Sequence, residues 1–359
     1  MRLSVASLVT MVGWLAAVQP ARAQRPPADR LQLTLDVSEA EAVLAILAKR
    51  QAHQPVDSAD WRGLFATEPY RRLKAREASM RRAFTDADFQ QFVLSDSLGA
   101  RASELGQTLA DWRRADLTAA AARAFAYLPA DARIRARVYP VIKPAGNSFV
   151  FEASTDAAIF LYLNPSETQA QFENTVAHEL HHIGYATVSG RGDSAIASLP
   201  PDVKAAAEWV GAFGEGFAML AAAGGPDVHP HAESPAAVRA RWDRDMANVG
   251  PDLLKVQRFL LDIVGGKLRT EQQRDSVGYG FFGVQGPWYT VGWKMAVTVE
   301  RRFGRTRLIG CEQDPRTVLL WYNRAAAEQN RAGGEPLPLW SDELLRALAV
   351  APAPGASPG

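Results

Sequence analysis

The sequence predicts an α+β fold that is mainly α-helical and carries a small antiparallel β-sheet. Three observations lead to this prediction. Hydrophobic residues make up 47% of the 359 residues, which is enough to bury a substantial core. Apolar side chains recur at helical spacing through most of the chain. The period changes to one typical of strands at residue 133, and strand signals continue to Pro165, so we expect a short sheet near the middle of a helical body.

The first 23 residues have the features of a secretory signal peptide. Arg2 gives a positive start, residues 4–18 form an apolar run, and Ala21-Arg22-Ala23 matches a small-x-small cleavage site. The run is short for a membrane span, although an uncleaved membrane anchor is the alternative. We therefore expect an exported chain, periplasmic or extracellular, that begins near Gln24 and has no stable membrane span after cleavage.

Residues 24–130 are predicted to form a helical N-terminal region. It opens with LQLTLDV, which reads as a strand or an extended lead-in. A helix is expected from Ser38, because Ser38 can cap it and Glu41 would complete a capping box ahead of an apolar face. Helical patterns then continue to about residue 128.

The strand pattern comes next. The segments IRARVYPVI, SFVFEA and AAIFLYLNP predict two or three short antiparallel strands, of which the last is expected to be an edge strand. Helical signals return at Ser166, where Ser166 and Gln169 offer a capping box. We expect a core over residues 131–330, a helical segment over 331–350 and a disordered tail, APAPGASPG, over 351–359.

Composition limits the classes of partner. Lys and Arg number 40 against 39 Asp and Glu, so the chain lacks the excess of cations that a nucleic-acid partner would require. Cys311 is the single cysteine, so an internal disulfide is impossible. It also lacks an evident base nearby in the sequence, which argues against a nucleophilic role.

Three of the six histidines lie in the stretch HELHH, residues 178–182. On a helix, His178 and His182 are four residues apart and point the same way, so they can hold one metal ion. Glu179 would lie beside them and can act on a water molecule without being a ligand, which is the arrangement of zinc peptidases. His181 lies on the other flank, where we expect a hydrogen-bonded or partly exposed side chain.

A catalytic zinc needs a third protein ligand. Glu208 and Glu215 are seven residues apart on one predicted helix, and we favour Glu215 because glycines flank it. Those glycines would allow close packing against the helix of the two histidines. His229 and His231 lie beyond a glycine break, where they could meet a substrate oxyanion or belong to a surface loop.

At this point the chain resembles gluzincin-type metallopeptidases, and more closely a group of bacterial zinc-dependent peptidases. The matching positions are His178 to His182, Glu215-Gly216-Phe217-Ala218, Tyr289 with Gly292 and Met295, and Pro315 with Tyr322-Asn323. The resemblance implies a zincin-like core, Zn²⁺ as cofactor and a peptide or protein substrate. One departure is Met219, because many gluzincins have an aspartate four residues after the glutamate ligand to orient a histidine.

The sequence therefore predicts an exported zinc hydrolase, most simply a peptidase, with Glu179 as general base. Tyr289 is the preferred hydrogen-bond donor to the oxyanion, and Tyr279 is a weaker alternative. A zinc hydrolase of another amide or ester, and a metal-binding module without activity, are the other candidate functions. The G-x-G-x-x-G match at GYGFFG follows no predicted strand, so a dinucleotide site is not expected. The Arg-Gly-Asp tripeptide at Arg191 carries no specific meaning.

Overall fold

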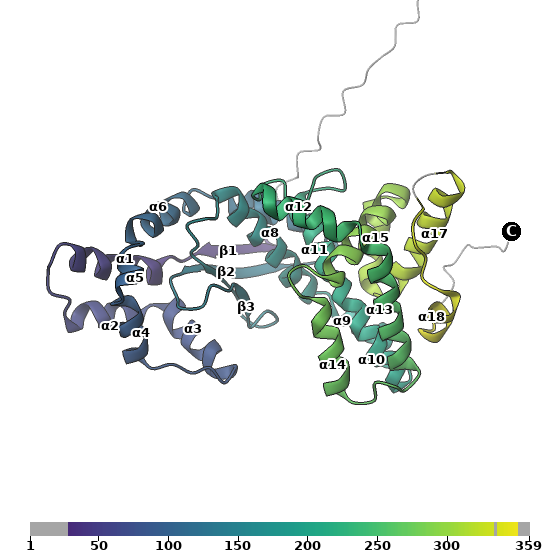
Figure 1. Ribbon diagram of the computed structural model, residues 1–359, viewed down its shortest axis with the longest axis horizontal. Helices are drawn as coiled ribbons and strands as arrows, with labels where there is room; N and C mark the ends of the chain where they lie inside the picture. Colours follow the sequence, from purple (N-terminus) through teal and green to yellow (C-terminus); the bar gives the residue numbers. More distant parts are fainter. Residues whose placement is uncertain (1–27, 334–335, 351–359) are drawn as a thin grey trace, which may run out of the picture.

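The structure is a computed structural model, and it describes residues 28–333 and 336–350 (Figure 1). The predicted signal peptide and the predicted disordered tail lie outside the described residues. The described part is mainly helical with one four-stranded sheet, which confirms the predicted balance of helix and strand. None of its helices is both long and apolar enough to cross a membrane.

In the N-terminal part of the described chain, one strand comes first, a series of helices follows, and the other strands of the sheet come last. The strands are β1 (Leu31–Leu35), β2 (Ile134–Val141), β3 (Phe149–Phe151) and β4 (Ala157–Tyr162). The helices between β1 and β2 are α1 (Ser38–Gln51), α2 (Ser58–Ala66), α3 (Glu68–Ser79), α4 (Asp86–Val93), α5 (Asp96–Gly99), α6 (Ala102–Trp112) and α7 (Leu117–Phe125).

The remaining elements are helical. They are α8 (Gln169–Ala186), α9 (Gly190–Ala197), α10 (Pro201–Val210), α11 (Gly214–Ala223), α12 (Ala236–Met246), α13 (Val249–Val264), α14 (Glu271–Gly278), α15 (Pro287–Phe303), α16 (Arg305–Gly310), α17 (Thr317–Arg331) and α18 (Asp342–Ala347). Short 3-10 turns over Gly211–Phe213, Tyr279–Phe281 and Cys311–Gln313 join some of them.

The sheet is mixed, and here the predicted antiparallel pairing was wrong. Its strand order is β1-β2-β4-β3, with β1–β2 and β2–β4 parallel and only β3–β4 antiparallel. The antiparallel pairing expected for these segments is confirmed for β3 and β4 alone. The chain passes β3 before returning as β4, so the whole connection from β2 to β4 is long enough for parallel pairing.

The expectation that AIFLYLN forms an edge strand was also wrong. This segment is β4, which lies between β2 and β3, and β1 and β3 are the edges. All residues from Ala157 to Leu161 are buried. Because successive side chains of a strand point to opposite faces, both faces of β4 must be covered. A strand that holds an extended substrate by its free edge would therefore have to be β3 or β1.

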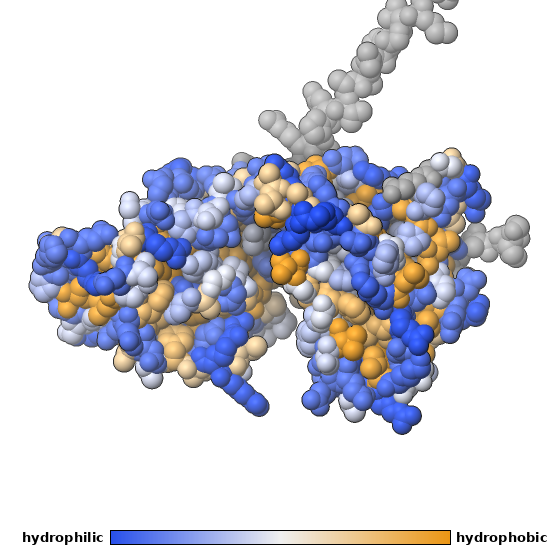
Figure 2. Space-filling model, viewed as in Figure 1, coloured by the Kyte–Doolittle hydropathy of each residue, from blue (hydrophilic) through white to orange (hydrophobic). Residues whose placement is uncertain are grey.

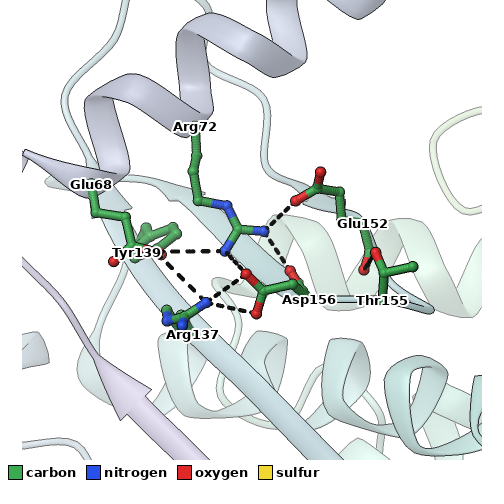
Figure 3. A network of polar contacts seen from close by, with 7 residues as sticks. All are labelled: Glu68, Arg72, Arg137, Tyr139, Glu152, Thr155 and Asp156. Atoms are coloured by element: carbon green, nitrogen blue, oxygen red, sulfur yellow. Dashed lines mark hydrogen bonds and ion pairs between the residues drawn. The ribbon is translucent and has the colours of Figure 1, made fainter.

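A network of charged side chains attaches the β3–β4 turn to α3 and β2 (Figure 3). Arg72 on α3 reaches Glu152 at 2.7 Å and Asp156 at 3.1 Å, and Arg137 on β2 reaches Asp156 at 2.7 Å. Glu68 accepts a hydrogen bond from the hydroxyl of Tyr139 at 3.0 Å. Several charges share partners here, so the network holds the turn more firmly than an isolated surface pair would.

Two hydrophobic cores divide the molecule. The sheet and the N-terminal helices of the first core lie on the left of Figure 1, and α13, α15 and α17 of the second lie on the right. The first joins the sheet, the N-terminal helices and the apolar face of α8. The second joins α11 with α13, α15 and α17. Figure 2 shows the surface hollowed between these two parts at its lower edge. Helices α8 and α11 thus come from different cores and meet at their junction.

Neither predicted capping box forms where the sequence suggested it. Thr168 caps α8, with Gln171 completing the box, rather than Ser166 with Gln169. Helix α1 begins at Ser38 itself. Val37 is therefore its N-cap residue, and no side chain makes a capping hydrogen bond there. Caps depend on backbone geometry at a single residue, so a serine, threonine or aspartate nearby can serve instead.

Candidate metal centre

Helix α8 presents two histidines toward the junction of the two cores. Phe172, Val176 and Leu180 bury the opposite face in the first core. That face fixes the rotation of the helix about its axis. His178 and His182, four residues apart, then lie one above the other and remain half-buried.

Helix α11 brings Glu215 to the same place. Its second glycine, Gly216, makes this possible, because a Cβ there would lie 2.0 Å from the backbone nitrogen of Trp293 on α15. The sequence interpretation attributed the flanking glycines to packing against the helix of the histidines. The close contact is with α15 instead, and a Cβ on Gly214 would meet nothing within 4 Å.

The three side chains form a nearly equilateral triangle. His178 Nε2 and His182 Nε2 are 3.1 Å apart, and they lie 3.2 and 3.3 Å from Glu215 Oε2. Tetrahedral zinc with bonds of 2.0–2.1 Å separates its ligand atoms by about 3.3–3.4 Å. The donor set and its spacing therefore fit a zinc ion, and these three residues could hold one.

The charges of the cluster favour a cation. Burial alone would raise the pKa of Glu215, but the charge of His182 and hydrogen bonds from both histidines hold that pKa well below its usual range. Burial likewise opposes protonation of His182, yet Glu215 and then Glu179 raise the pKa of His182 above its usual value. The carboxylates thus stabilise positive charge between the rings, which is where a divalent cation would lie.

Glu179 and Tyr289 lie next to the triangle. Glu179 is half-buried and follows His178 directly on α8. The ring of Tyr289, near the start of α15, lies parallel to that of His178 with centroids 6.4 Å apart. Burial raises the pKa of Tyr289, and so do the charge of Glu215 and a hydrogen bond to it. Its phenol is therefore a protonated donor at the edge of the cluster.

The structure does not bring Glu208 or Tyr279 to the cluster. Glu208 is exposed on α10 and lies 3.9 Å from Lys204. Tyr279 is 64% exposed and packs edge-on against Trp209, with ring centroids 5.6 Å apart. The first glycine of GYGFFG, Gly278, ends helix α14 and packs against the ring of Trp209, so a helix rather than a strand leads into the motif. That segment is a packed turn.

His181 is fully buried behind the cluster. Its Nε2 atom lies 3.5 Å from Oε1 of Glu312, a residue that the sequence did not single out. Burial, followed by the charges of His182 and His178, lowers the pKa of His181 to about 3, and burial raises the pKa of Glu312. Both groups are therefore uncharged. Nothing in the sequence pairs residues 131 positions apart. Cys311 is also buried, and burial raises the pKa of its thiol to about 12, as suits an inert thiol.

A cavity of about 320 Å³ opens beside the triangle. His178 and Tyr289 line it together with His231 from the loop after α11. His229 lies outside this lining and contacts Asp243 at 3.1 Å. The other residues of its wall are Glu167, Gln171, Asn174, Thr175, Met219, Pro230, Glu233, Ser234, Val238 and Gln285. This volume is in the range of pockets that hold small ligands or part of a peptide.

Comparison with known proteins gives one match. Residues 61–331 match the family described as "Putative zinc dependent peptidase (DUF5700)", and since this span is most of the chain, the chain belongs to that family. The matched span contains His178, His182, Glu179, Glu215 and Tyr289. Comparison with curated proteins and with solved structures gave no significant match.

Proposed function

We propose that this chain is an exported zinc-dependent peptidase of gluzincin type, with His178, His182 and Glu215 as zinc ligands. The observation that supports it most directly is the triangle of two imidazole nitrogens and one carboxylate oxygen, with sides of 3.1–3.3 Å. A triangle of protein ligands leaves one tetrahedral position for water or substrate, which distinguishes catalytic from structural zinc sites. Membership of a family of zinc-dependent peptidases agrees with this assignment.

Zinc bound there would supply Lewis-acid activation of water and of the substrate carbonyl group. Glu179 accepts a proton from the water whose oxygen attacks the carbonyl carbon. It then gives that proton to the amine nitrogen as the carbon–nitrogen bond breaks. Glu179 is well placed for both transfers, because it adjoins His178 without belonging to the triangle.

Tyr289 acts as a hydrogen-bond donor to the oxyanion. Burial and the carboxylate of Glu215 raise the pKa of Tyr289, so the hydroxyl keeps its proton at neutral pH. It borders the cavity that also exposes His178, so substrate in that cavity can reach both residues. A preorganised donor of this kind stabilises the charge that develops on the carbonyl oxygen.

Two substitutions separate metal binding from catalysis. Glu179→Gln should retain zinc and lose nearly all turnover of a broad peptide library, because an amide cannot accept the proton from water. His182→Ala should lose the metal as well as the activity. Elemental analysis of the purified variants measures the first property, and peptide cleavage before and after chelation and zinc readdition measures the second. The exposed Glu208→Gln variant serves as a control and should behave as wild type.

Each outcome assigns a function. Full activity of the Glu179→Gln variant would refute its role as general base. Zinc binding without cleavage of any peptide would refute the peptidase, and cleavage of an ester or another amide would then distinguish a different hydrolase from a metal-binding module without activity.

A further inference from the structure

Arg241 on α12 is a half-buried cation that lacks a carboxylate partner among the described residues. Its Nη2 atom donates a single long hydrogen bond, of 3.5 Å, to Gln285 Oε1. Its Nε atom is buried and makes no hydrogen bond within the described part of the chain. Leaving that donor unpaired away from water is costly. The position therefore suits an anionic partner that comes from outside the chain.

Gln285 connects this cation to the cavity beside the proposed zinc ligands, because Arg241 lies outside the lining of the cavity and contacts it through Gln285. Gln285 lines the cavity with His178 and Tyr289. Its backbone has φ of +62°, a left-handed conformation that is uncommon for residues other than glycine. The turn that holds it there is tight, since a Cβ on Gly286 would lie 2.6 Å from the carbonyl oxygen of Phe281. Such strain gathers at ligand sites, where the surrounding structure enforces it.

His231 completes the same part of the wall. The residue is only 7% exposed, and its Nδ1 atom lies 3.2 Å from the Ser234 hydroxyl. Its Nε2 atom makes no hydrogen bond of good geometry among the described residues. The side chain of Gln285 is nevertheless close enough to raise the pKa of His231. Burial outweighs this, and with the charge of His229 it lowers the pKa of His231 to about 4. The ring of His231 is thus neutral, and its Nε2 atom is available to form a hydrogen bond with a ligand.

We propose that Arg241, assisted by Gln285 and His231, forms a subsite that binds a carboxylate of the substrate. This inference rests on the proposed peptidase function and defines its substrate class. The planar guanidinium fork can donate two parallel hydrogen bonds to one carboxylate, and this would replace the long contact with Gln285. The carboxylate is either the C-terminus of the peptide or the side chain of an aspartate or glutamate near the scissile bond.

Acidic residues in the cavity do not occupy this subsite. Glu167 lies before the start of α8, and its carboxylate is hydrogen-bonded by the side-chain amide of Asn164 at 3.3 Å. Glu233 is exposed, and its charge acts on Arg123 from α7. Neither carboxylate lies within ion-pair distance of Arg241. A substrate carboxylate would therefore meet no competing carboxylate at the guanidinium, which it would reach by displacing the side chain of Gln285.

Matched peptides test the proposal. One pair differs only in a free or amidated C-terminus, and a second pair, both amidated, differs only in glutamate or glutamine next to the cleaved bond. Wild type should favour the carboxylate member of one pair by about tenfold to a hundredfold in kcat/KM, mainly through KM. The pair that shows the preference identifies the source of the carboxylate.

Three variants connect that preference to Arg241. Arg241→Met should bring the ratio within the responsive pair close to one. Arg241→Lys should keep only part of the preference, because it retains the charge without the fork. Arg244→Met on the same helix removes an exposed arginine and should keep the wild-type ratio. Circular dichroism and thermal unfolding of each variant establish that it is folded. Equal cleavage within both pairs by wild type, or an unchanged preference in Arg241→Met, would overturn the subsite.

A binding measurement separates this inference from the proposed function. Zinc-loaded Glu179→Gln protein is titrated with the same fluorescently labelled peptides, and anisotropy gives the Kd without turnover. If wild type cleaves no peptide, the peptidase proposal fails. The Kd ratios of Glu179→Gln and of the Glu179→Gln, Arg241→Met double variant still decide the subsite. A preference for the carboxylate that depends on Arg241 supports it, and equal affinities refute it.

Discussion

Gly216 is the residue whose substitution most directly tests how the fold builds the candidate metal centre. In Gly216→Ala, the new Cβ would start 2.0 Å from Trp293 N and 2.2 Å from Gly292 C, both backbone atoms of α15. Ordinary van der Waals contact begins near 3.4 Å, so α11 and α15 would have to separate by about 1.4 Å at this point. Backbone atoms inside two packed helices cannot rotate away as a flexible side chain could.

Two opposing contributions set the expected change in unfolding free energy of Gly216→Ala. Overpacking of this kind costs about 1–3 kcal/mol or more, while alanine in place of glycine returns up to about 1 kcal/mol of helix propensity. Because the clash is with backbone atoms that cannot rotate away, the cost lies near the upper end of that range, and we expect Gly216→Ala to lose about 2 kcal/mol of unfolding free energy. Glu215 is the adjacent residue, so the triangle of ligand atoms should distort by more than the 0.2 Å or so that a metal site tolerates. Zinc affinity should then fall at least about tenfold.

Gly214→Ala is the matched control, because a Cβ there meets nothing within 4 Å and its backbone is already helical. It should leave zinc affinity unchanged and raise stability by about 0.4–1 kcal/mol. Urea unfolding gives the stabilities, and competition with a chromophoric chelator gives the affinities. If Gly216→Ala matched Gly214→Ala in both properties, the close approach of α11 and α15 would not be what positions Glu215.

Three further predictions concern the third ligand, a buried acid and the N-terminus. Glu215→Ala should weaken zinc binding by a factor of about 10²–10³, because one of four ligands contributes about a quarter of a binding free energy of about 10–16 kcal/mol. Glu208→Ala should leave zinc binding unchanged. If chelator competition ranked the two variants the other way, the third ligand would be Glu208. Burial raises the pKa of Glu39 to about 8, with a hydrogen bond from Ile142 N opposing this, so the folded state binds this proton more tightly than the unfolded state. The free energy of unfolding should therefore fall as pH rises from about 4.5 to about 8, by at most about 5 kcal/mol. Urea unfolding at pH 5 and pH 9 measures this fall, and Glu39→Gln should abolish it. An unchanged pH dependence in the variant would contradict the assignment to Glu39. N-terminal sequencing of the exported protein should give a start within two residues of Gln24, and an intact Met1 chain in the membrane fraction would refute signal cleavage.

The sequence alone located most secondary structure and placed both histidines on one helix face. These features depend on local rules, since helix and strand periodicity and the spacing of four residues act within one or two turns of the chain. For the same reason the sequence placed three of the strands well, because β2, β3 and β4 fall within the three segments that were predicted to be strands. The choice of Glu215 over Glu208 also began from local evidence, the glycines on either side of it.

Only the tertiary structure decided which distant segments meet. It placed β4 inside a mixed sheet, turned Gly216 against α15 rather than α8, brought His181 close to Glu312 and set Arg241 against Gln285 of the cavity wall. These contacts join residues separated by many positions, and each depends on the packing of two cores against one another. A local pattern carries no record of such pairings, because the free energy that selects them arises from surfaces buried together only after the chain has folded.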